Sequence, residues 1–291
     1  MKSFSTRHMA HRERSTRISW ENPMRVTRVT KFAQLCSSGI ILISSSIGLF
    51  AFSWPLFIAA ENDRAARWLF LALMPLVTVV AFIELTFGKL NVKTLAFLGV
   101  LSATGAVLRA FGAGAVGLEP IWFLIIIGAR ALGKKFGFIL GLTTMLSSAL
   151  LTGGVGPWLA FQMMAAAWIG WGAGALPLKS NRSRFEIVLL AFYGAGTGLL
   201  FGLLMDLQLW PWIASPATSI AYLPGGEILA NLQRFVIFHF ATALAWDIPR
   251  AIFTLILILI FGKPILNAIR RAMQRGNFEI NPERALEQTA A

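Results

Sequence analysis

The residues best suited to chemistry lie in a long apolar run near the C-terminus. Asp247, Pro249 and Arg250 stand near the middle of this run, and His239 stands near its start. Ionised side chains at that depth of a bilayer cost at least about 2.5–3.5 kcal/mol each, so they need a partner or a function. His239, Asp247 and Arg250 recur with helical spacing, which predicts that they share one face of a helix. Pro249 has no amide hydrogen and therefore leaves the Ala245 carbonyl free to accept another hydrogen bond.

Two interpretations of Asp247 and Arg250 stay open at this point. They form an internal ion pair that stabilises a helix bundle, or they bind a ligand, because buried ions need partners of opposite charge. His239 is expected to be an interfacial or packed histidine and not a metal ligand. The other two of the three histidines lie in the N-terminal tail, so no histidine cluster is expected.

Further polar residues gather at one expected edge of the membrane. Glu119 follows a glycine-rich segment, which is either a lid or a simple connector. Trp158 lies at this edge, where tryptophan is ordinarily an anchor, and Gln162 lies one turn deeper, where an amide needs a partner. Asp206 and Trp210 share a face at the end of another apolar run. Gln162 is therefore a better ligand candidate than Trp158.

The composition indicates an all-α polytopic membrane protein. Of the 291 residues, 56% are hydrophobic and 13% are charged, whereas soluble domains carry about 25% charged residues. Mean hydropathy is +0.68, and several uncharged runs are long enough to cross a bilayer as helices. Eight membrane spans are expected, over residues 34–60, 67–88, 92–110, 118–132, 136–152, 157–177, 185–208 and 236–262.

The distribution of charge predicts the orientation of these spans. The net charge of +13 could indicate nucleic-acid binding, but the basic residues lie in tails and short loops, so nucleic acid is not an expected partner. With the N-terminus inside, 21 of the 26 Lys and Arg residues lie on the inner side and 4 on the outer side, with Arg250 inside a span. Basic residues concentrate on the cytoplasmic side of membranes, so both termini are expected in the cytoplasm.

Small residues become frequent from the third span onward. Gly99 and Ala103 are four residues apart on one stripe, which permits the close approach of another helix from the same chain or from a partner. Gly194, Gly198 and Gly202 form a second stripe of the same kind. Four parts are expected: a basic cytoplasmic tail over 1–33, two additional N-terminal spans over 34–88, a six-helix substrate-binding core over 89–275, and a C-terminal tail over 276–291.

Sequence signatures of catalysis are absent from the chain. It contains no phosphate-binding glycine loop of the Walker type, no HExxH and no GxSxG. Cys36 is the single cysteine, which excludes an internal disulfide and a cysteine-based metal site. We therefore expect no enzyme, no cofactor and no metal. Energy for uphill transport would have to come from another chain or from an ion gradient.

Four segments resemble the substrate-binding S component of energy-coupling factor (ECF) vitamin transporters. They are KTLAFLGVLSATGAVLR, LLTGGVGPWLAFQM, LLAFYGAGTGLLFGLLMDLQLW and LAWDIPRAIFTLILILIFGKPILNAIRR, within residues 89–275. The resemblance implies six helices in a bacterial cell membrane, a vitamin bound near the outer face, a transmembrane T component and two ATP-binding subunits. It also implies that Gly99 and Ala103 contact the T component, with glycine where alanine is usual.

The resemblance further implies which residues bind the vitamin. Ligands in that family lie between the first outer loop and the outer parts of the last three helices, and the S components of cobalamin transporters are the most similar. Two other functions are kept as alternatives: an ion-coupled secondary transporter of a small organic solute that uses Asp247 and Arg250, and a membrane enzyme acting on a lipid or prenyl substrate. The implied substrate-binding set is Glu119, Trp158, Gln162, Asp206, Trp210, Trp246, Asp247 and Arg250.

Overall fold

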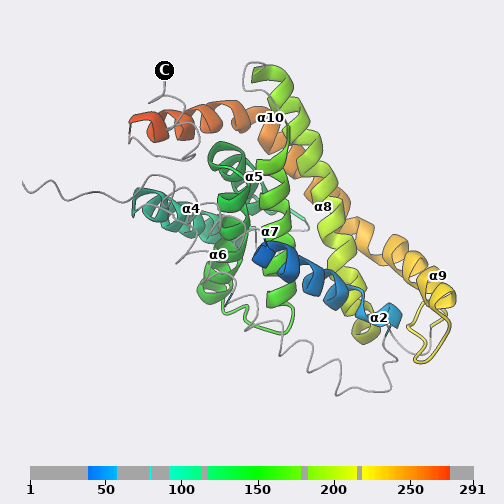
Figure 1. Cartoon of the computed structure of the whole chain (residues 1–291). Helices are drawn as coiled ribbons and strands as arrows, with labels where there is room; N and C mark the ends of the chain where they lie inside the picture. The colour runs from blue at the N-terminus through cyan, green and yellow to red at the C-terminus, as the bar shows by residue number, and fades with distance from the viewer. Residues whose placement is uncertain are drawn as a thin grey trace, which may run out of the picture.

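The protein is a bundle of helices, shown as a computed structural model in Figure 1. The structure describes residues 39–57, 79, 92–112, 117–177, 183–214 and 218–275, and this part of the chain contains helices and no strand. Its helices are an N-terminal helix Gly39–Phe52, α2 (Trp54–Phe57), α4 (Val92–Phe111), α5 (Ile121–Leu132), α6 (Lys134–Thr152), α7 (Leu159–Ala175), α8 (Ser183–Ile213), α9 (Ile228–Phe238), the π-helix η1 (His239–Ala243) and α10 (Leu244–Arg275).

Four of the described helices are long and apolar enough to cross a membrane. They are α4, α6, α8 and the continuous helix Ile228–Arg275, which joins α9, η1 and α10. Shorter apolar helices are Gly39–Phe52 and α5. The fold class predicted from the sequence, an all-α polytopic membrane protein, is confirmed. The predicted span 67–88, apart from residue 79, and the predicted tails 1–33 and 276–291 lie outside the described residues.

The largest error in the predicted spans concerns the last helix. The predicted spans 185–208 and 236–262 leave 209–235 without a helix. This is wrong in part, because α8 continues to Ile213 and α9 begins at Ile228. The span expected over 236–262 is the middle of a helix that runs from Ile228 to Arg275. Proline and glycine before residue 228 obscure the helix start in the sequence. Lys263 and Pro264 suggest an end at 262, but the helix continues through Pro264. Figure 1 shows the last turns of α10 leaving the line of its middle part, as helices do where a proline removes a hydrogen bond.

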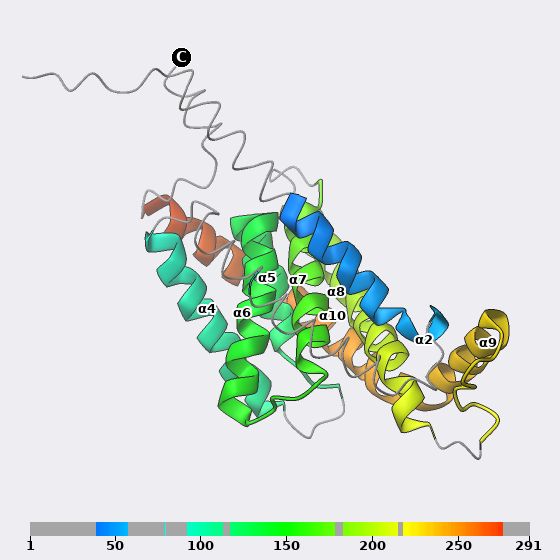
Figure 2. The same cartoon turned by 60° about the horizontal axis from the view of Figure 1, so that its bottom comes forward.

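Helix α5 forms the centre of the bundle. Every residue from Ile121 to Ala129 is buried, and the helix contacts α4, α6, α7, α8 and α10. A helix that is apolar on all sides is expected to be surrounded by other helices. Gly133, with φ 95°, reverses the chain directly into α6. Figure 2 shows α4 and α6 on one side of α5 and α8 on the other, and the red last turns of α10 lie on the side of α4.

Close backbone contacts join the helices around α5. Gly137 of α6 and Gly170 of α7 face each other so closely that a Cβ on either would meet the carbonyl of the other. The stripe on α8 makes a similar contact with α10, since a Cβ on Gly198 would lie 3.3 Å from the Ala251 Cα. Small residues at these positions allow the backbones of membrane helices to approach. The glycine stripe predicted on α8 is thus a contact within the chain.

The N-terminal helix Gly39–Phe52 packs beside the core. Trp168 Nε1 of α7 donates a hydrogen bond of 2.9 Å to Ser45 Oγ. The ring of Phe52 contacts the ring of Phe161 at a centroid distance of 5.0 Å, and Gly48 lets Met164 and Trp168 approach. The helix Gly39–Phe52, which lies within the first predicted span, therefore packs against α7.

Candidate functional site

A charged cluster lies between α8, α10 and the segment before α5. Arg250 Nε donates a hydrogen bond of 2.9 Å to Glu119 Oε2, and Arg250 Nη1 donates one of 2.5 Å to Asp247 Oδ1. Trp122 Nε1 donates to the same Glu119 oxygen over 2.8 Å. The Arg250 guanidinium also lies 5.2 Å from the ring centre of Phe201, in cation–π geometry. The predicted pair of Asp247 and Arg250 is thus present, and it extends to Glu119.

Two glycines make room for this cluster. Gly117 has φ 68°, and a Cβ at this position would clash with the Trp246 carbonyl oxygen. It would also lie only 2.7 Å from the Arg250 amide nitrogen. Gly117 therefore lets the segment that carries Glu119 lie directly on the backbone of α10. At Gly202 of α8, a Cβ would occupy the position of the Asp247 carboxylate. The third glycine of the predicted stripe thus accommodates the Asp247 side chain, whereas Gly198 accommodates the backbone of α10.

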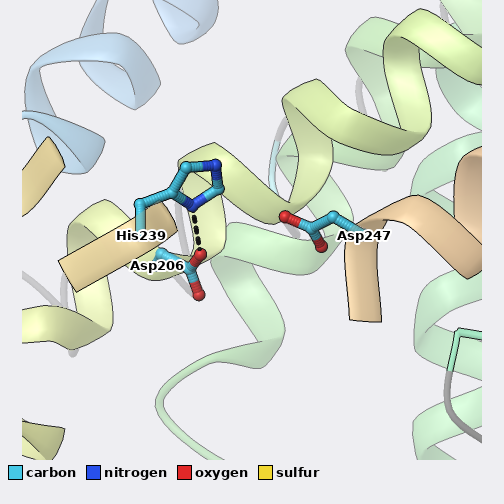
Figure 3. Close-up of side chains that lie close together, drawn as sticks. All are labelled: Asp206, His239 and Asp247. Atoms are coloured by element: carbon cyan, nitrogen blue, oxygen red, sulfur yellow. Dashed lines mark hydrogen bonds and ion pairs between the residues drawn. The ribbon is translucent and has the colours of Figure 1, made fainter. Parts of the chain in front are cut away.

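A second polar pair lies next to Asp247. His239 Nδ1 and Asp206 Oδ2 are 2.7 Å apart, and Figure 3 shows the Asp247 carboxylate beside this pair. His239 begins the π-helix, which explains this placement. In a regular α-helix, positions eight residues apart point about 80° away from each other. The π-helix takes up one extra residue in its turn, so His239 and Asp247 are oriented as if they were seven residues apart. Their side chains then point within about 20° of each other around the helix axis.

The cluster is buried and carries more negative than positive groups. The Asp247 side chain is 3% exposed and that of Arg250 10%. Glu119 is 22% exposed and Asp206 21%. Three carboxyl groups therefore surround one guanidinium and one imidazole. Asp247 Oδ2 is buried and has no hydrogen-bond partner among the described residues.

The cluster brings together four of the eight predicted substrate-binding residues. Glu119, Asp206, Asp247 and Arg250 lie in it. Gln162 belongs to another group, where Arg109 Nη2 donates to Gln162 Oε1 over 3.4 Å. Arg109 Nη1 also donates to Ser148 Oγ over 3.2 Å. The partner expected for the Gln162 amide is thus Arg109 at the end of α4.

The three predicted tryptophans lie outside the cluster. Trp210 is fully buried against Phe235 and Phe238, and its Nε1 donates to the Ile220 carbonyl over 2.8 Å. Trp158 is 41% exposed and Trp246 is 48% exposed. Trp246 shares α10 with Asp247, but it is adjacent in sequence and therefore points about 100° away from it. Trp210 stabilises the contact between α8 and α9.

Several residues of the cluster had no role in the sequence interpretation. Trp122 stands three residues after Glu119, so one helical turn brings the two together. Phe201 and Trp122 are in ring contact at 4.4 Å and form the apolar wall beside Arg250. His239 was assigned a packing role, because its spacing to Asp247 suggests a shared face without showing that Asp206 of another helix lies there.

A second ionic cluster lies at the opposite end of the bundle. The Glu186 side chain, 2% exposed, accepts hydrogen bonds from Arg130 Nε at 2.6 Å and from Arg270 Nη2 at 2.7 Å. Arg130 also donates to the Leu176 carbonyl over 2.9 Å. These contacts join α5, α8 and the last turns of α10. We call this end the predicted inner end, and the end with Glu119 and Trp158 the predicted outer end.

Two cavities lie outside the charged cluster. One, of about 260 Å³, lies beside Glu186, Lys263 and Arg270 at the predicted inner end. The other is a groove of about 520 Å³ along α4 and α6. Its lining is mostly apolar or small: Leu95, Leu98, Gly99, Ser102, Ala103, Ala106, Val107, Thr143, Ser147 and Leu151. Neither cavity is lined by any of the eight predicted substrate-binding residues.

Comparison with protein families identifies the core. Residues 93–262 match the family model described as ECF transporter, substrate-specific component. The chain belongs to this family. A search among curated proteins and a search among solved structures gave no match. The matched region of this S component begins in α4 and ends in α10, so it contains both the groove and the charged cluster, and it leaves out the helix Gly39–Phe52. The family consists of substrate-binding transporter subunits that work in the bilayer with a T component and ATPases.

Proposed function

We propose that this S component captures a vitamin from outside a bacterial cell and delivers it together with a T component and two ATP-binding subunits. Cobalamin is the first candidate, because the quoted sequence segments resemble S components of that type. Both termini lie in the cytoplasm in this proposal, as the charge distribution favours. The buried polar groups at the predicted outer end, including the four predicted residues that the structure brings together, support substrate binding there.

The groove along α4 carries the proposal of T-component docking. Gly99 and Ala103 are exposed, and a Cβ built on Gly99 meets nothing within 4 Å. A stripe of small residues that served packing within the chain would be covered, as it is on α8. Small exposed residues in an apolar groove instead suit a partner helix in the membrane, where association depends on close backbone approach. Gly99 and Ala103 are the two positions that the family resemblance assigns to this contact.

The docking assignment is tested by filling the groove. Ala103→Leu places a branched side chain where a partner helix would approach. We expect the variant to fold but to lose co-purification with the T component and the ATP-binding subunits, measured by affinity capture from membranes that contain all subunits. Ala96→Leu is the matched control, because Ala96 is also exposed on α4 but does not line the groove. Equal capture of subunits by the two variants would refute the assignment.

Substrate identity is tested separately. The complete S component is purified and its bound small molecules are read by absorbance and mass spectrometry. Cobalamin would appear by its visible absorption, and another vitamin by its mass. Recovery of a non-vitamin solute would reject the proposed substrate class without affecting the docking assignment.

An ion-coupled secondary transporter is the second candidate. The buried pair of Asp206 and His239 beside Asp247 favours it, because ionisable groups inside membrane bundles often serve proton relays. This candidate predicts that the chain alone, in liposomes with a proton gradient, accumulates cobalamin. Accumulation that requires the T component and ATP would exclude it.

A further inference from the structure

Three potential metal ligands from two long helices converge at one point of the charged cluster. Asp206 comes from α8, His239 from η1 and Asp247 from α10. One ligand atom of each lies within 4.8 Å of those of the other two. Figure 3 shows the Asp206 carboxylate and the His239 ring on one side of a small gap and the Asp247 carboxylate on the other. The three groups are thus arranged around a common centre.

One of these three groups, the Asp247 carboxylate, has an unused acceptor. Asp247 Oδ1 is held by Arg250, whereas Asp247 Oδ2 is buried without a hydrogen-bond partner among the described residues. A buried oxygen of a carboxylate is costly unless it accepts a hydrogen bond or binds a cation. Glycine at position 202 leaves the space that this carboxylate occupies. The side chain is therefore accommodated where its second oxygen accepts no hydrogen bond from the described residues.

The charges of the cluster favour a cationic ligand. Glu119, Asp206 and Asp247 supply three carboxyl groups, and Arg250 supplies one permanent positive charge between two of them. Buried charges in proteins are paired or coordinate metals. A divalent cation between Asp206 and Asp247 would balance the two negative charges that Arg250 leaves over.

We propose that Asp206, His239 and Asp247 bind one divalent transition-metal ion of the zinc, cobalt or nickel type. Imidazole together with carboxylate oxygen suits these ions, whereas magnesium and calcium prefer oxygen ligands alone. Metal–ligand bonds of about 2.0–2.2 Å place ligand atoms about 3–4 Å apart, so small side-chain rotations would close the present arrangement. The ion would replace the hydrogen bond between His239 and Asp206. Arg250 and Gly202 would hold the Asp247 carboxylate in position.

This proposal departs from the expectation from sequence that the chain binds no metal. It does not depend on the identity of the vitamin, because the three ligands come from the chain alone. The resemblance to other S components also plays no part in it. The observations that carry it are the convergence of three side chains, the unused oxygen of Asp247 and the excess of carboxylates.

The test uses the full chain and the metal alone. The protein is purified in detergent without a polyhistidine tag, with His8→Gln and His11→Gln so that the tail contains no histidine, and is treated with a chelator. Zn²⁺ binding is then measured by calorimetry, and the bound metal is counted by mass spectrometry after gel filtration. Co²⁺ replaces Zn²⁺ for an absorption spectrum. We expect one ion per chain and a cobalt spectrum with nitrogen and oxygen ligands.

Variants decide whether the metal lies at this point. His239→Gln and Asp206→Asn should each weaken Zn²⁺ binding by at least about tenfold, the lower range seen when groups that order a metal are removed. Glu227→Gln, which changes an exposed carboxylate outside the cluster, is the control and should retain one ion per chain. Folding of each variant is checked by gel filtration and thermal unfolding, and the cobalt spectrum of the starting protein is independent of any variant that does not fold. Absence of metal from a folded chain, or binding unchanged in a folded His239→Gln variant, would overturn the proposal.

Discussion

Replacing Arg250 by methionine tests whether the charged cluster holds the fold together. Methionine keeps much of the apolar stem but removes the donors to Glu119 and Asp247. Removing one partner of a buried ion pair costs about 3–5 kcal/mol, because the other charge stays buried without compensation. That full cost applies to Asp247, whose side chain is 3% exposed. Glu119, at 22% exposure, regains water and adds less.

The expected loss is large enough to measure in detergent. For a domain of this size, each kcal/mol lowers the melting temperature by about 2–4 °C, so the Arg250→Met variant should melt about 6–20 °C lower. The assay is thermal unfolding followed by intrinsic tryptophan fluorescence, with the 10 tryptophans as reporters. Arg184→Met is the matched control, because Arg184 is exposed at the start of α8. Its effect should stay within about 0.5 kcal/mol.

A double variant separates the ion pair from a general loss of packing. Asp247→Asn combined with Arg250→Met removes both charges, so it should be more stable than Arg250→Met alone. The coupling energy between the two positions follows from the double-mutant cycle. A melting temperature of Arg250→Met equal to that of Arg184→Met would refute the structural role. Additive effects of the two substitutions would show that Asp247 and Arg250 do not stabilise each other.

Two further predictions concern the bundle away from this cluster. Gly170→Ala should lower the melting temperature, because the new Cβ would meet the Gly137 carbonyl of α6. The control Gly196→Ala adds a Cβ that meets nothing within 4 Å, so it should leave the melting temperature unchanged or raise it, since alanine is favoured over glycine in a helix interior by about 1 kcal/mol. Equal shifts of the two variants would contradict the close contact of α6 and α7. Glu186→Gln should lower the free energy of unfolding by about 3–5 kcal/mol, because Arg130 and Arg270 lose their shared carboxylate. The control Glu227→Gln changes an exposed residue and should alter stability little. Both are measured by the same thermal unfolding, and an unchanged melting temperature of Glu186→Gln would show that the cluster around Glu186 is dispensable for stability.

The predictable part of the fold follows from long apolar runs and small-residue stripes. These patterns repeat within one helix, so they give α4 and the glycine face of α8 without knowledge of neighbouring helices. That α10 packs on this face is seen only in the structure. The bounds of the last helix could not be predicted in the same way. Pro264 ordinarily ends a helix, but here the helix continues after it. The π-helix at His239 has no signal of its own in the sequence.

The candidate site was predictable to the extent that its residues face each other along one helix. Asp247 and Arg250 are three residues apart, and their pairing follows from that spacing. The contacts of Glu119 with Arg250 and of Asp206 with His239 join separate elements, so spacing does not show them. Trp210 illustrates the opposite error. It shares a face with Asp206 on α8, yet the arrival of α9 buries it against Phe235.

The position of α5 explains how the proposed docking groove and a charged cluster coexist in one small bundle. Helices in lipid gain no hydrophobic stabilisation from association, so a docking face must be smooth and free of buried charge. A site for a polar ligand needs the reverse, and its charges must be shielded from lipid. The chain places the groove with Gly99 and Ala103 on α4 and α6, and the ion pairs on α8 and α10. Between the two lies α5, whose residues from Ile121 to Ala129 are all buried. Its uninterrupted apolar sequence separates the groove from the ion pairs. Glu119, just before its first turn, connects α5 to the charged cluster through its ion pair with Arg250.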